Sequence, residues 1–149
     1  MLGRIGMAVA DELPPLSPAP DGLAAMNTAW MQLCAGAFGF VAVALGAFAA
    51  HGLKSKLDAY ALDIMATATQ YLLLHAAVLL ALSAIPSGRW TNLAALALAT
   101  GALLFSGSLY ALAFSGIKGL GAITPIGGLL LLMGWGLVIV AAYTRLAGR

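Results

Sequence analysis

Charged residues are scarce in this sequence. They make up 8% of the 149 residues, against roughly a quarter in soluble domains, while 62% are hydrophobic. Seven Lys and Arg against five Asp and Glu leave no dense basic patch, which excludes a nucleic-acid-binding protein. A single cysteine, Cys34, excludes an internal disulfide and any multi-cysteine metal site. Since so apolar a surface cannot face water, the composition predicts an integral membrane protein.

The few charges divide the chain into four long uncharged stretches, at residues 22–53, 64–88, 90–117 and 119–144. A helix needs roughly 20 apolar residues to cross a bilayer core of about 30 Å, so each stretch can span it. A soluble bundle of four buried helices would need polar outer faces, and no stretch has one. We therefore predict an all-α fold, an integral membrane bundle of four transmembrane helices.

Capping signals place the ends of the first two spans. The first is expected over about residues 29–50, with Gly52 in a left-handed cap. Residues 55–58 have the spacing of a capping box, with Asp58 in place of the usual Glu or Gln. A short interfacial helical segment over 57–63 is expected to lead into the second span.

The third span is expected to begin near Thr91 or Asn92 as N-cap and to end before Gly116. In the fourth, Thr124 is the predicted cap and Pro125 takes the first helical position, where its missing N–H costs nothing. The glycine-rich connection between these two spans predicts either a tight turn at the headgroups or irregular backbone that is covered by protein or faces a water-filled cavity.

The first 25 residues differ from the rest. They are rich in proline and contain three of the five acidic residues, so we expect a disordered tail over 1–25 before a transmembrane domain over 26–149. Residues 5–10 are too short an apolar run for a signal peptide. Met26, just before the first span, is a natural alternative start.

No Asp, Glu, Lys or Arg lies well inside any span. Ion-coupled transporters and pumps use such a group, and the chain also lacks a G-x-S-x-G nucleophile motif. We therefore predict no catalytic residue, no metal and no cofactor. The expected partner is the lipid bilayer.

One polar stripe stands out on the second span. Thr67, Tyr71 and His75 follow helical spacing with Gln70 beside them, and His75 lies roughly 16 Å deep, near the midplane. His75 is either a packing residue that hydrogen-bonds a neighbouring helix, a ligand or proton site, or a metal or haem ligand. His51 lies at the membrane edge, and this difference in depth disfavours a haem shared with His75.

Polar residues of the third span match those depths. Counted from the shared membrane face, Ser106 is level with His75, and Tyr110 is level with Gln70. We predict that His75 approaches Ser106 or Ser108 and that Gln70 lies near Tyr110, because unpaired polar groups are costly in hydrocarbon. With Tyr71 and His51, these residues form the candidate polar site.

Small residues recur at helical packing spacing in two stripes. We expect both to pack helices together, and they also allow a homo-oligomer. The stripes are Ala42, Gly46 and Ala50, and Gly107, Ala111 and Ser115.

Four ordered motifs, the last of them followed by Gly134-Trp135, resemble one family of small membrane proteins, the domain of unknown function 423, which is similar to transmembrane protein 256 of animals. The resemblance implies a multi-pass protein of the bacterial cytoplasmic membrane and supplies no activity. Ala49 stands where the family usually has glycine, and Tyr71-Leu72 where it often has a further histidine, which disfavours a multi-histidine metal site. The motifs are GAFAAHGLK (46–54), Gln70-Tyr71 with His75, FSGSLYAL (105–112), LGAITPIGG (120–128) and Gly134-Trp135.

Three hypotheses about function follow. The first is a non-enzymatic accessory or membrane-homeostasis bundle. The second is a protein that binds or passes a small molecule or ion through uncharged polar residues around His75, with the ligand unidentified. The third, an enzyme or redox protein, has no visible nucleophile–base pair or ligand cluster. The positive-inside rule leaves the orientation undecided, with three basic residues near each face.

Overall fold

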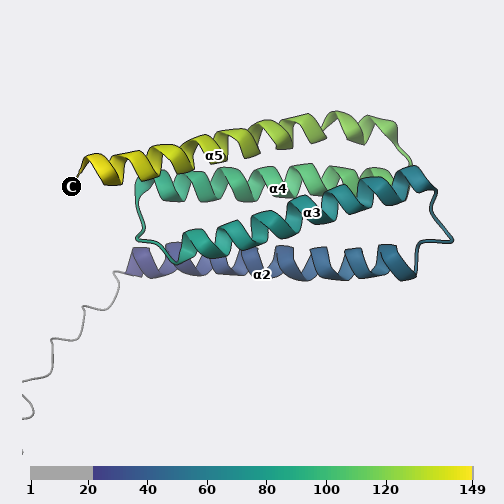
Figure 1. Ribbon diagram of the computed structural model, residues 1–149, viewed down its shortest axis with the longest axis horizontal. Coiled ribbons are helices and arrows are strands. Elements are labelled where there is room, and N and C mark those ends of the chain that lie inside the picture. Colours follow the sequence, from purple (N-terminus) through teal and green to yellow (C-terminus); the bar gives the residue numbers. More distant parts are fainter. Residues whose placement is uncertain (1–21, 149) are drawn as a thin grey trace, which may run out of the picture.

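Four long helices make up the part of the chain that the computed structural model describes, residues 22–148 (Figure 1). All four are long and apolar enough to cross a membrane, which confirms the predicted all-α, four-span fold. The expected tail lies outside the described residues up to position 21, while residues 22–25 belong to the first helix. The elements are α2 (Gly22–His51), α3 (Ala59–Ser83), α4 (Arg89–Ser115), the short 3₁₀ helix η1 (Lys118–Ala122) and α5 (Thr124–Ala147).

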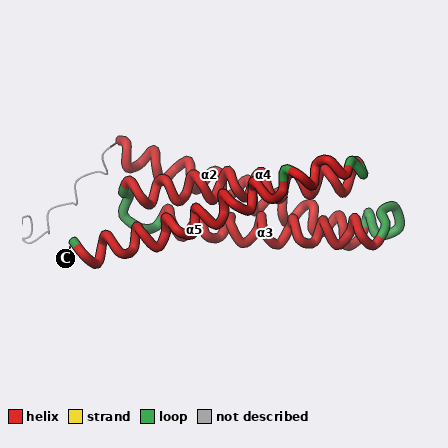
Figure 2. The backbone as a smooth tube through the Cα atoms, turned by 90° about the horizontal axis from the view of Figure 1, so that it is seen from above, coloured by secondary structure: helices red, strands yellow, loops and turns green. Residues whose placement is uncertain are grey.

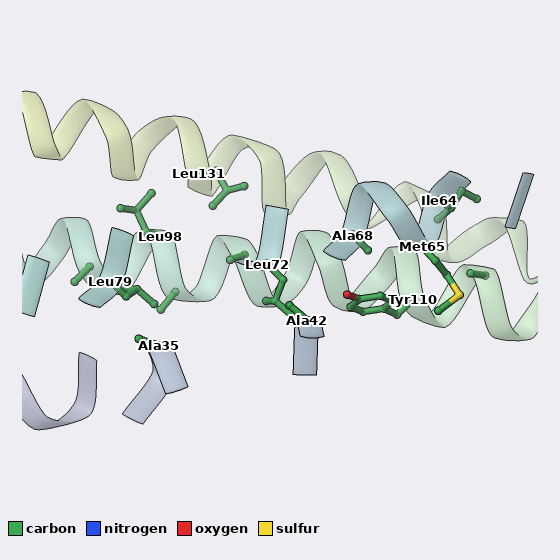
Figure 3. Close-up of a cluster of buried hydrophobic side chains, with 14 of the residues drawn as sticks. Ala35, Ala42, Ile64, Met65, Ala68, Leu72, Leu79, Leu98, Tyr110 and Leu131 are labelled. Atoms are coloured by element: carbon green, nitrogen blue, oxygen red, sulfur yellow. The ribbon is translucent and has the colours of Figure 1, made fainter. Parts of the chain in front are cut away.

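The helices run antiparallel in chain order, and each packs mainly on the next (Figures 1 and 2). Helix α4 is the most buried and contacts all three others, while α2 is the least buried. The backbones of α3 and α5 do not meet, nor do those of α2 and α5. Figure 3 shows the apolar core that this arrangement encloses, with side chains from all four helices; among them are Ala42, Leu72, Leu79, Leu98 and Leu131.

The connection from α2 to α3 differs from the prediction in two respects. Gly52 is not left-handed, because Gly116 is the one residue of the described chain with positive φ. Gly52 instead packs against the Phe48 ring, which a Cβ at this position would approach to 2.8 Å. Residues 52–57 form consecutive turns, and α3 starts at Ala59 with Asp58 as its cap instead of the expected Ser55. The helical segment expected over 57–63 is present from Ala59 onward as the first turns of α3. The Asp58 carboxylate accepts a 2.7 Å hydrogen bond from the N–H of Ala61.

The ends of α4 and α5 are predicted more closely. Gly116 terminates α4 at φ 69°, and proline occupies the first turn of α5, as expected. The predicted cap of α4 is wrong: Gly88 is the N-cap, three residues before the expected Thr91, and the helix begins at Arg89. Thr124 does not cap α5 with its side chain either; its hydroxyl bonds to α4 instead.

Glycines bring α4 and α5 into direct contact. A Cβ on Gly127 would overlap the backbone of Phe105, one on Gly101 would lie 2.9 Å from the Leu131 nitrogen, and one on Gly134 would lie 2.6 Å from Leu98. The two backbones therefore approach as closely as helices can, the usual means of association where lipid supplies no hydrophobic drive.

The predicted small-residue stripes behave differently from each other. Ala42 is buried and Gly46 packs against Thr69, so the first stripe supports the α2–α3 contact. Gly107 has nothing within 4 Å of its Cβ direction, and its stripe lies on the outer surface of α4.

Candidate functional site

His75 is buried in the middle of α3, with 2% of its surface exposed. Its Nδ1 lies 2.8 Å from the carbonyl oxygen of Tyr71, one turn earlier. A carbonyl only accepts, so Nδ1 carries the proton and donates this bond. The other ring nitrogen, Nε2, is buried and has no hydrogen-bond partner among residues 28–148, whose side chains the structure describes. In the tautomer that donates from Nδ1, Nε2 carries a lone pair and no proton.

Aromatic side chains surround this imidazole. The Tyr71 ring lies 6.2 Å from it, roughly parallel, and stacks in turn on Phe105 of α4 at 4.4 Å. From the other side, Trp135 of α5 meets the imidazole edge-on, with ring centroids 6.3 Å apart. Three helices thus contribute to the surroundings of one histidine.

A groove of about 710 Å³ opens between α3 and α5 at this place, and His75 lines it together with the three aromatic residues. The groove exists because the glycine contacts hold α5 against α4 and not against α3. Pro125 and Gly128, at the start of α5, line its end near the α4–α5 connection. Apart from the histidine and the polar edges of Tyr71 and Trp135, its walls are apolar.

The predicted contact between Gln70 and Tyr110 is not formed; the preceding residue, Thr69, makes it instead. The Tyr110 hydroxyl lies 2.9 Å from the hydroxyl of Thr69, which joins α3 to α4. Gln70 is exposed and lines a separate groove of about 510 Å³ between α2 and α3, with Lys54 at its rim. Tyr110 does bond to α3 at the predicted level, one residue from Gln70. Counting residues gives the depth of a side chain but not the direction in which it faces.

The hydrogen bond expected between His75 and Ser106 or Ser108 is also not formed. Ser108 bonds to the Thr124 hydroxyl at 2.8 Å, joining α4 to the start of α5, and donates to the Phe105 carbonyl at 3.0 Å. Ser106 is fully buried, and its hydroxyl has no partner in the described chain. His51 lies exposed at the end of α2, whereas His75 lies in the middle of α3.

The site residues that sequence reasoning missed are Phe105 and Trp135. Both lie within motifs that carried the family resemblance, which was the available signal. Among residues 22–148, no three His, Cys, Asp or Glu residues come together as a metal site. The arrangement therefore places aromatic faces and one buried acceptor nitrogen, Nε2, beside the groove.

Comparison with known proteins agrees with this architecture. A family described as "Protein of unknown function (DUF423)" matches residues 45–128, which include His75 and Phe105. A UPF0382 membrane protein of Haemophilus influenzae is 50% identical over 99 residues, which cover 65% of this chain and 80% of that protein. A UPF0382 membrane protein of Staphylococcus epidermidis is 44% identical over 110 residues, or 72% of this chain and 89% of that protein.

The UPF0382 inner membrane protein YgdD of Escherichia coli K12 is 38% identical over 120 residues, which cover 78% of this chain and 92% of that protein. No solved structure is detectably similar. The family has no assigned function, and its members are membrane proteins. The chain therefore belongs to the DUF423 family and is a multi-pass protein of the bacterial inner membrane.

Proposed function

We propose that this protein binds a small membrane-soluble molecule in the groove between α3 and α5, and that the molecule donates a hydrogen bond to His75 Nε2. The observation that carries the proposal is the buried, unpartnered lone pair of that nitrogen beside a groove that His75 lines. Within hydrocarbon depth a buried polar atom without a partner is costly, and leucine would fill the space without that cost.

A role in packing alone accounts less well for this histidine. The polar side-chain pairs that join helices in the described chain each have both partners: Thr69 with Tyr110, Ser108 with Thr124, and Thr91 with Arg145. His75 makes no bond to another helix, since its one hydrogen bond returns to its own backbone. His75 therefore does not join two helices by a hydrogen bond, as the hydroxyl pairs do.

The surroundings define the class of ligand. Tyr71, Phe105 and Trp135 favour a flat or bulky apolar body, and the neutral acceptor selects a hydroxyl or N–H donor over an anion. The groove opens sideways between two helices, so the ligand enters directly from the lipid. We infer binding without catalysis, which is compatible with an accessory or membrane-homeostasis role.

A matched pair of probes tests the proposal: para-tert-butylphenol, which has a hydroxyl donor, and its methyl ether, which does not. In the full chain with Trp30→Phe and Trp90→Phe, Trp135 is the remaining tryptophan and reports binding by its emission. We expect the phenol to bind roughly tenfold more tightly, because one hydrogen bond of about 1.4 kcal/mol separates the probes.

His75→Leu should abolish this preference, while His51→Leu, at the exposed histidine, should retain it. Both variants should keep wild-type resistance to unfolding by SDS, since Nε2 bonds to no residue of the described chain. Equal affinities of the two probes for the wild-type groove, or a preference that survives His75→Leu, would contradict the proposal.

A further inference from the structure

A second site lies at the opposite end of the molecule, where α4 begins and α5 ends (left in Figure 1). A pocket of about 500 Å³ lies there, lined by the 86–91 connection and the last turns of α5. It contains both arginines that the structure describes, Arg89 and Arg145. This end carries no described acidic residue, because residues 64–148 contain no Asp or Glu.

The guanidinium of Arg145 is fixed in place at this pocket. Its Nη2 donates to the Thr91 hydroxyl at 2.6 Å and to the Pro86 carbonyl at 3.2 Å. Thr91 is itself buried, with 2% of its surface exposed, so it is a rigid partner. The N–H groups on Nη1 and Nε bond to nothing in the described chain. A guanidinium held by one nitrogen keeps a pair of donors free, the arrangement that binds a phosphate oxygen pair.

Arg89 and the start of α4 add to the positive potential. The Arg89 guanidinium lies 5.4 Å from the centre of the Trp90 ring, a cation–π distance, and has no carboxylate partner among the described residues. Gly88 caps α4 without a side chain, so the first N–H groups of the helix have no side-chain acceptor. Two cations and the N-terminus of α4 therefore share one pocket with the C-terminal end of α5, and no acidic side chain of the described chain lies there to balance the two cations.

The depth of the pocket identifies the anion. The pocket begins where the apolar spans of α4 and α5 end, which is the level of the lipid headgroups. Trp90 lies at the same level, as interfacial tryptophans do. We propose that Arg145 and Arg89 bind the phosphate of an anionic phospholipid in this leaflet, with the acyl chains along the outer surface of α4 and α5.

The test measures how many phosphatidylglycerol molecules the full-length protein retains in native mass spectrometry after purification in detergent. Arg145→Gln should lower retention about tenfold, the effect of one charge-assisted bond pair. Lys118→Gln, which removes the same charge at the opposite end, should leave retention unchanged. Arg145→Lys keeps the charge but loses the planar donor pair, so its retention should fall between those of wild type and Arg145→Gln.

Arg89→Gln, which leaves the Arg145–Thr91 bond intact, should also lower retention and covers the case that Arg145→Gln fails to fold. Equal losses in Arg145→Gln and Lys118→Gln would overturn the proposal, because they indicate unspecific charge attraction. Wild-type retention in Arg145→Lys would overturn the role of the donor pair. Displacement of the lipid by millimolar inorganic phosphate would show a site for the free anion and overturn the lipid assignment.

Discussion

Helix α5 has two neighbours and meets them in different ways. On the α4 side, Gly127 and Gly134 allow its backbone to touch that of the partner helix. On the α3 side, its backbone makes no contact, and Trp135 reaches across a groove to His75. Helix α5 thus packs tightly on α4 through glycines. On the α3 side its aromatic side chain lines an open groove.

The packed α4–α5 interface holds the helices together, whereas the open groove between α3 and α5 contains the candidate site. In lipid, apolar surfaces gain little by closing on each other, so a gap between helices persists unless small residues permit close packing. Gly127 and Gly128 show the rule at adjacent positions. A Cβ on the first would overlap the Phe105 backbone, while one on the second would meet the Phe105 ring at an ordinary 3.9 Å.

The largest effect is therefore expected from Gly127→Ala. The added methyl group must push α4 and α5 apart, which should lower the free energy of unfolding by about 3 kcal/mol. Gly128→Ala is the matched control and should cost nothing, because its methyl group enters the groove. Unfolding in mixed micelles of increasing SDS content measures both. Equal losses of unfolding free energy in Gly127→Ala and Gly128→Ala would contradict the distinction between the packed α4–α5 interface and the open α3–α5 groove.

A smaller effect is expected from the hydroxyl pair between α3 and α4. Tyr110→Phe removes the bond to Thr69 and should destabilise the protein by about 1 kcal/mol. Thr69→Val should cost a similar amount, and the double variant should cost little more than either, since both lose the same bond. Tyr143→Phe, at an exposed hydroxyl without a described partner, is the control. Additive losses would show that the two hydroxyls act independently.

The four spans were predictable because charge spacing alone determines them in a chain with so few charges. Gly116 and the proline of the first α5 turn were predictable because local backbone chemistry decides their conformation. The conformation of Gly52 was not predictable in this way, since Gly52 packs against the Phe48 ring. Local sequence therefore yields helix number and several ends, but not ends that depend on packing.

The candidate site was predictable in part. The sequence indicated His75 and Tyr71, because a polar stripe at mid-depth is rare on an apolar helix. It predicted that Tyr110 pairs with Gln70, whereas Tyr110 bonds to Thr69. It also predicted that His75 pairs with Ser106 or Ser108, whereas Ser108 bonds to Thr124. Depth follows from counting residues, whereas the direction in which a helical residue faces depends on how the helices pack. The α4–α5 glycine contacts are one example, because they leave open the groove that Phe105 and Trp135 line.

The free lone pair of His75 Nε2 can be observed directly by nitrogen NMR. The chain has two histidines, so His51→Asn with isotope-labelled histidine leaves His75 as the only signal. We predict a neutral ring with the proton on Nδ1, and an Nε2 resonance that moves to its hydrogen-bonded position with para-tert-butylphenol but not with the methyl ether. A proton already on Nε2, or the same response to both probes, would contradict the account.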